Sequence, residues 1–110
     1  MINTTVPIAP ELTIYDSVAI SATTSSAATA LPLDSSYPNQ WQVLMIVNED
    51  TINLARFKLG GSSVAATSAS TSILPGNTLV INRNSQTYIA FKSDTSTVKL
   101  TVTVGGYGPQ

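Results

Sequence analysis

Apolar and polar residues alternate along much of the chain with the period of two that is typical of β-strands. The cleanest example is the segment 98–104, VKLTVTV, in which every second residue is Val or Leu. Such a strand presents one face to a core and the other to solvent. The segment 41–48 differs because it is apolar on both faces through its middle, which predicts a central strand or one covered twice.

Other segments rich in β-branched and aromatic residues predict further strands. These segments are 12–20, 27–33, 54–59, 79–81 and 88–91. Pro32 favours an edge position for the second strand of the chain. Polar clusters at 48–51 and 82–85 are typical of hairpin turns between neighbouring strands, and 93–96 turns the chain into its last strand.

Seven to eight strands in this rhythm, with turn signals at intervals of roughly 8–12 residues, indicate one all-β domain. We expect an antiparallel β-sandwich or a jelly-roll-like barrel over residues 11–104. Residues 1–10 are predicted to be an extended N-terminal arm, because Pro7 and Pro10 disfavour a helix there. Residues 105–110 are predicted to be a flexible C-terminal tail.

The uncharged segment 60–77, GGSSVAATSASTSILPGN, joins two of the predicted strands. It lacks the G-x-x-x-x-G-K-[ST] pattern of a phosphate-binding loop. We predict a long connection with a short edge strand near residues 63–66. The dipeptide Pro75-Gly76 is the signature of a type II turn, in which Pro fixes one φ angle and Gly takes the positive φ that follows.

Composition narrows the possible partners of the 110-residue chain. Charged residues make up 10% of it, against roughly 25% in an ordinary domain, while 15 Thr and 14 Ser supply much of its polarity. The five basic residues are scattered, which argues against nucleic acid as a partner. The longest apolar run, 43–47, is far below the ~20 residues of a membrane span. We expect no membrane partner and no signal peptide.

Catalytic and metal-binding side chains are scarce. The chain has neither His nor Cys, which removes Ser-His-Asp triads, thiolate nucleophiles and zinc–thiolate sites. Ser96 and Lys99 match an S-x-x-K pattern, but a strand places two such residues on opposite faces. We therefore predict that the protein is not an enzyme and has no cofactor, metal or catalytic residue. A loose calcium site at Asn48, Glu49 and Asp50 is a minor alternative to a solvated turn.

Three residues near the chain ends are candidates for contact with a partner. Val6 and Ile8 lie in the apolar arm, and Tyr107 lies in the predicted tail. Among the other aromatic residues, Trp41 is expected in the core or at its edge.

A series of short motifs runs in order through residues 43–104. They are Val47-Asn48 before a turn, Ala55-Arg56-Phe57-Lys58-Leu59-Gly60, Ser63-Val64-Ala65-Ala66-Thr67, Leu74-Pro75-Gly76, Leu79-Val80-Ile81, Thr87-Tyr88-Ile89-Ala90-Phe91 and Leu100-Thr101-Val102-Thr103-Val104-Gly105. This order resembles a group of small virion proteins of tailed bacteriophages. Tyr88 departs from it where the group often has His, and Lys58-Leu59 interrupts its simpler Phe-Gly join.

The resemblance implies a capsid decoration (cement) protein without catalytic residues, located on the capsid surface of a virion that assembles in the host cytoplasm. Its partners would be the major capsid protein and other copies of the chain, with a homotrimer favoured. The alternative is a carbohydrate- or receptor-binding module of a phage fibre or a surface adhesin. That alternative predicts a row of exposed aromatics, for which Tyr15, Tyr37 and Trp41 are the candidates.

Overall fold

The computed structural model describes residues 12–37 and 40–107, which form eight β-strands and no helix. The strands are β1 (Leu12–Ala22), β2 (Ala27–Ala30), β3 (Val43–Asn48), β4 (Ala55–Gly60), β5 (Thr71–Ile73), β6 (Thr78–Asn82), β7 (Tyr88–Ser93) and β8 (Val98–Tyr107). These residues contain no helix that could cross a membrane.

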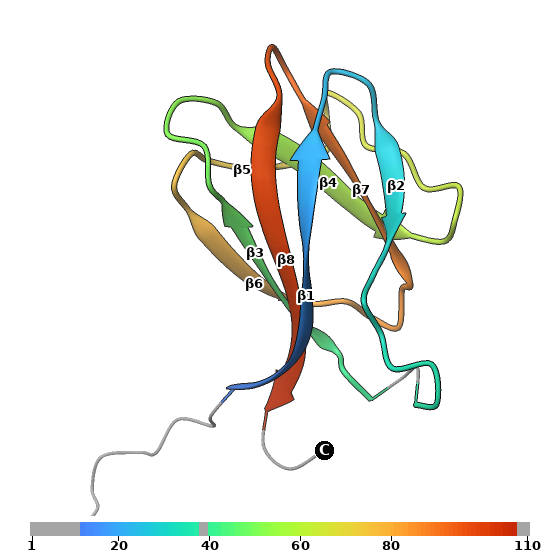
Figure 1. Ribbon diagram of the computed structural model, residues 1–110. Helices are drawn as coiled ribbons and strands as arrows, with labels where there is room; N and C mark the ends of the chain where they lie inside the picture. The colour runs from blue at the N-terminus through green and yellow to red at the C-terminus, as the bar shows by residue number, and fades with distance from the viewer. Residues whose placement is uncertain (1–11, 38–39, 108–110) are drawn as a thin grey trace, which may run out of the picture.

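The strands form two antiparallel four-stranded sheets, with the orders β1-β8-β3-β6 and β2-β7-β4-β5 (Figure 1). Their pairing is nested, because β1 pairs with β8, β2 with β7, β3 with β6 and β4 with β5. A β-ribbon wound so that successive strand pairs alternate between two sheets has jelly-roll topology. The predicted all-β, single-domain antiparallel sandwich or jelly-roll-like barrel is therefore confirmed.

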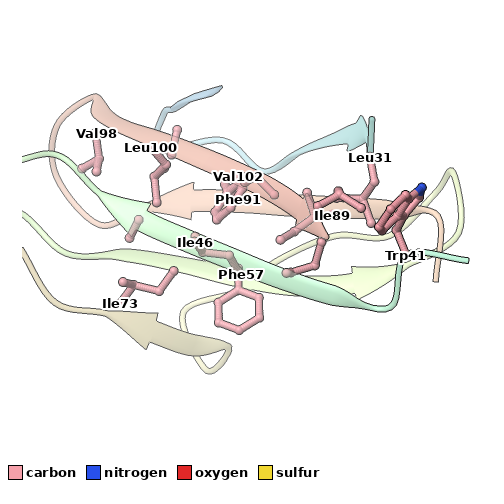
Figure 2. Close-up of a cluster of buried hydrophobic side chains, with 14 residues drawn as sticks. Leu31, Trp41, Ile46, Phe57, Ile73, Ile89, Phe91, Val98, Leu100 and Val102 are labelled. Atoms are coloured by element: carbon pink, nitrogen blue, oxygen red, sulfur yellow. The ribbon is translucent and has the colours of Figure 1, made fainter. Parts of the chain in front are cut away.

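The core lies between the two sheets and takes buried side chains from both (Figure 2). Leu44 and Ile46 of β3 and Ile89 and Phe91 of β7 are each at most 2% exposed. The rings of Phe57 and Phe91 meet across neighbouring strands, with their centroids 6.4 Å apart. Each such side chain contributes about 1.5–3 kcal/mol by leaving water, so this layer is the main source of stability.

The alternation predicted for the last strand is confirmed, since Val98, Leu100, Val102 and Val104 are fully buried and Lys99 is exposed. β3 is a central strand, with β8 on one side and β6 on the other, as its doubly apolar pattern predicted. The edge position suggested by Pro32 is also confirmed, because β2 ends a sheet.

The hairpins predicted at 48–51 and 82–85 are wrong. β3 and β4 lie in different sheets, as do β6 and β7, so each turn carries the chain across the core. Polar turn residues mark a reversal of the chain, but they do not determine whether the strands pair or face each other across a sandwich. In the described parts of the chain, β4 and β5 are the only consecutive strands that pair with each other.

The edge strand expected within the connection 60–77 is present, but not at residues 63–66. It is β5, which pairs with the first half of β4. The 63–66 segment makes no strand, because Ala66 directs its backbone N–H to the hydroxyl of Ser26 at 2.7 Å instead of to a sheet.

The predicted type II turn at the end of this connection is confirmed. Gly76 has a φ of +72°, and the N–H of Asn77 donates to the carbonyl of Leu74 at 3.1 Å. This turn moves the chain from the edge of the second sheet, β5, to the edge of the first, β6.

The C-terminal boundary predicted at residue 104 is wrong by three residues. β8 continues to Tyr107, which pairs with Leu12, and Gly105 pairs with Ile14. Glycine permits this close approach because a Cβ at position 105 would overlap the backbone carbonyl of Thr13. Residues 105–107 therefore belong to the sandwich.

Candidate functional site

Of the three residues expected to contact a partner, only Tyr107 falls within the described residues. Val6 and Ile8, with the rest of the arm 1–10, lie outside the described residues. Tyr107 is the last residue of β8, and its backbone is fixed by pairing with β1. Its backbone therefore belongs to a sheet rather than to a free tail, and its side chain lies outside the description.

Carboxylates in the described residues are engaged by nearby groups. Asp16 and Asp34 accept backbone N–H groups from residues one and two positions ahead, at 2.8 and 2.9 Å. Glu49 accepts the hydroxyl of Thr101 and lies 3.9 Å from the ammonium group of Lys99. Within the described ranges, no three Asp or Glu side chains gather in a way that could hold a metal ion.

The polar turn after β3 is closed by its own hydrogen bonds. The buried Asn48 donates to the carbonyls of Asn53 and Ile73, each at 3.0 Å, and accepts the N–H of Asp50 at 2.9 Å. Asp50 accepts the N–H groups of Asn53 and Ile52, and these bonds hold its pKa below the ordinary value. Of the side chains considered for calcium, Asn48 and Asp50 thus accept backbone N–H groups and Glu49 accepts the hydroxyl of Thr101, and the turn is a structural unit.

On the outer side of the second sheet, Arg56 links β4 to two connections. Its Nε and Nη2 bind the two carboxylate oxygens of Asp94 at 3.0 and 3.1 Å, and its Nη1 donates to the carbonyl of Ser70 at 3.2 Å. This two-point geometry is the strong form of an Arg–carboxylate pair. It raises the pKa of Arg56 and lowers the pKa of Asp94.

The Arg56–Asp94 pair predicts a pH dependence of stability. Because Arg56 holds the pKa of Asp94 below its ordinary 3.8, the folded state binds this proton more weakly than the unfolded state. The stabilisation is present above the ordinary pKa and is lost as the pH falls through the lowered one. Urea unfolding at several acidic pH values should show a shallower decline for Asp94→Asn, and equally for Arg56→Met. The effect is small because the pair is solvent-accessible, and unchanged slopes in both variants would contradict it.

The loop between β4 and β5 covers part of the outer side of the second sheet. Ala66, in the middle of the loop, is bonded to Ser26 just before β2, and β7 lies between β4 and β2 in that sheet. Ala66 is 4% exposed and Ala90, on the outer side of β7, is fully buried, although neither belongs to the main core. This side also carries Arg56, Lys58 and Lys92, which alternate with core residues.

The outer side of the first sheet has a different character. Val43, Met45 and Val47 alternate with the buried Leu44 and Ile46 and so point away from the core. The strand register extends this side across the neighbouring strands. We call the uncharged part of this side the open face: Ser17, Ala19, Val43, Met45, Val47, Thr78, Val80, Asn82, Thr101 and Thr103.

The open face ends at Lys99, which points to the same side of β8 as Thr101 and lies near the carboxylate of Glu49. Figure 1 shows β1, β8, β3 and β6 side by side, with no segment of the described chain laid across them. The centre of the face is formed by Met45 with Thr103 on one side and Val80, 47% exposed, on the other. The doubly apolar pattern of β3 was the sequence signal for this surface, but it did not reveal which side the fold leaves open.

The aromatic residues give a smaller candidate surface. Tyr15 lies at a register shift between Ile14 and Asp16, a β-bulge that redirects its side chain. Its ring stacks on Trp41, with the centroids 5.2 Å apart and the planes at 22°. Trp41 is 8% exposed and belongs to the core, as predicted. Of the aromatic side chains that the structure describes, Tyr15 and Tyr37 are the exposed ones.

A scan against protein-family models finds no match for this chain, and a search among curated proteins finds no significant similarity. The resemblance to phage virion proteins therefore depends on the sequence motifs alone, and the function has to be argued from the surface.

Proposed function

We propose that this protein is a structural component of a tailed-phage particle, a decoration (cement) protein that binds the outside of the head and stabilises the lattice of the major capsid protein. The observation that supports this most is the open face, an uncharged and partly apolar sheet surface with no cover in the described chain. The resemblance of residues 43–104 to phage virion proteins supplies the type of partner.

The open face suits a contact made by burial rather than by ion pairs. Apolar surface removed from water contributes about 25 cal/mol per Å², and this contribution is not screened by salt as an exposed ion pair is. The exposed hydroxyls of Ser17 and Thr78 can supply hydrogen bonds without the cost of burying a charge. A surface of this kind keeps its affinity when the ionic strength outside the cell changes.

The two sheets offer different surfaces to a partner. The second sheet has its own loop across it and carries the cations Arg56, Lys58 and Lys92. Binding through the first sheet therefore leaves a polar, charged side towards solvent. Many copies on one shell, each spanning a seam between capsid subunits, add up to a large stabilisation even when the single contact is modest.

Replacing Met45 by lysine tests the open face directly. The substitution places a charge at the centre of the face, and burying it unpaired in an interface costs about 2–5 kcal/mol, so affinity should fall about 30-fold or more. The measurement is co-sedimentation of purified protein with phage heads assembled without it, followed by heat disruption of the heads. Lys58→Glu, a charge change on the second sheet, is the control and should bind normally. Normal binding of Met45→Lys, or failure of the wild type to bind heads, contradicts the proposal.

A carbohydrate-binding module is the second candidate, favoured by one observation. The bulge in β1 brings Tyr15 onto Trp41 and leaves Tyr15 41% exposed, so one ring face is available for stacking against a sugar. Glycan-array binding that is lost in Tyr15→Ser, but retained in Met45→Lys, would favour this function over decoration.

A further inference from the structure

The four sheet edges of the sandwich are not equally protected against pairing with another strand. Exposed edges usually carry a device against such pairing, for example a short strand, a bulge, a charge or a cover. β1 has the bulge between Ile14 and Asp16 and the charge of Asp16 itself. β5 has three residues, and β2 has four, with the loop at Ser26 beside its start. Three of the four edges are therefore protected.

The fourth edge, β6, has no bulge, no charge and no cover from the described chain. Its five residues, Thr78 to Asn82, include no charge, no proline and no register shift, and no strand of the described chain pairs with its outer side. The only nearby cation that follows it, Arg83, is fully buried, and its guanidinium donates to the carbonyls of Trp41 and Gln86. The guanidinium of Arg83 therefore lies inside the domain and does not protect the edge of β6.

Apolar surface accompanies the free backbone of β6. Val80 is 47% exposed on the strand, and Leu74 is 53% exposed in the turn before it. A groove of about 300 Å³ runs beside the start of β6, between it and β5, and is lined in part by Ile73 and Leu79. An edge that combines unpaired backbone with apolar side chains is a template for an added strand.

We propose that β6 pairs with β6 of a second copy of this chain, antiparallel across a two-fold axis. In such a pairing the same surface contacts itself, so any charge on the strand would lie near an identical charge and repel it. β6 carries no charge, and two copies of it can therefore pair without repulsion. The described part of each chain has one edge of this kind, and antiparallel pairing of two such edges leaves neither free. The assembly therefore closes at two copies, in contrast to the trimer favoured by the sequence analysis.

The pairing joins the two first sheets into one sheet of eight strands. Thr78, Val80 and Asn82 belong to the open face, so the open faces of the two copies become one continuous surface. Dimerisation through β6 does not depend on the proposed function, because the unpaired edge is present whatever partner binds the open face. A contact made by a five-residue strand is small compared with the ~1,200 Å² of an ordinary stable interface, so the dimer should depend on protein concentration.

Sedimentation velocity and light scattering, over protein concentrations from about 1 μM to 1 mM, test the dimer. The wild type should move from the 11.5 kDa monomer towards twice that mass. Val80→Lys places two like charges near the two-fold axis and should raise the dissociation constant about tenfold or more. Thr78→Lys, at a second exposed position of the same edge, should act in the same direction, which guards against a folding defect in either variant.

Met45→Lys is the matched control, because it adds the same charge to the open face on β3, one strand in from the edge. It should dimerise like the wild type while losing the binding to heads, so the two proposals can fail separately. Backbone N–H groups of β6 that face the edge should exchange with solvent more slowly at high concentration in the wild type, and not in Val80→Lys. A wild type that stays monomeric to about 1 mM, or a dimer that survives Val80→Lys and Thr78→Lys but is lost in Met45→Lys, overturns the pairing.

Discussion

Replacing Arg83 by methionine is expected to lower the free energy of unfolding by about 2–4 kcal/mol. Arg83 is fully buried where β6 leaves the first sheet. Its Nε donates to the carbonyl of Trp41 and its Nη1 donates to the carbonyl of Gln86 at 2.8 Å, while its backbone N–H binds the carbonyl of Gln42 at 2.8 Å. The side chain therefore ties the segment before β3 to the segment before β7.

Two effects oppose each other in this variant. Burial lowers the pKa of Arg83, which shows that the charged form pays for its loss of hydration, and methionine removes that cost. Methionine also leaves two carbonyls without the guanidinium, at about 1–3 kcal/mol each when they are buried. In the wild type, the two carbonyl oxygens partly replace the water that the guanidinium loses on burial, which reduces the cost of burying the charge. We therefore expect the loss of the hydrogen bonds to outweigh the removal of that cost.

Chemical denaturation of the Arg83→Met variant measures this balance. Lys58→Met, the matched loss of a cation at an exposed position of β4, should change stability by less than about 0.5 kcal/mol. A stability of Arg83→Met equal to that of the wild type would show that the buried charge costs as much as its hydrogen bonds return.

Local pattern was sufficient to predict most strands of this fold, although β5 was expected at residues 63–66 and lies at Thr71–Ile73. The alternation in residues 98–104 predicts which side of β8 is buried, because a strand in a sandwich has one dry and one wet side. The doubly apolar middle of residues 41–48 predicts a central position for β3, since such a strand leaves no polar side for solvent. In each case, the burial of a strand side depends on residues that are close together in the sequence, so the sequence pattern predicts it.

The order of the strands was not predictable in this way. A polar turn such as 82–85 is compatible both with a hairpin and with a crossing to the other sheet, because the residues of the turn meet the same solvent in either case. The nested pairing brings the first strand against the last, and that contact depends on the whole chain. Gly105 illustrates the difficulty, because its lack of a side chain resembles a flexible tail until its partner strand is known.

The candidate surface was predictable only in part. The apolar outward residues of β3 were visible in the sequence, but the sequence does not say that the 61–70 loop covers the second sheet and not the first. Arg83 and Asn48 both stand in polar clusters that predict turns, and the pattern does not show that either residue is buried. Their burial results from the crossing of the chain between sheets, which places the ends of these turns against the core.

Replacing Asn48 by alanine is the second large effect that we expect, a loss of about 3–5 kcal/mol. Asn48 is fully buried at the end of β3, and its side chain makes three hydrogen bonds to backbone groups of Asp50, Asn53 and Ile73. The last of these lies in β5, so the amide joins the crossing between the sheets to the edge of the second sheet. Alanine leaves all three groups without their side-chain partner and adds a small cavity.

The measurement is thermal and urea unfolding, in which a loss of this size lowers Tm by about 10 °C or more in a domain of this length. Asn77→Ala, an exposed asparagine in the turn before β6, is the matched control and should stay within about 0.5 kcal/mol of the wild type. Asn48→Asp keeps the shape and the acceptor but loses both donors and buries a charge, so it should be at least as unstable as Asn48→Ala at pH 7. A loss below about 1 kcal/mol in Asn48→Ala would mean that water replaces the amide, and that the turn does not depend on Asn48 for its shape.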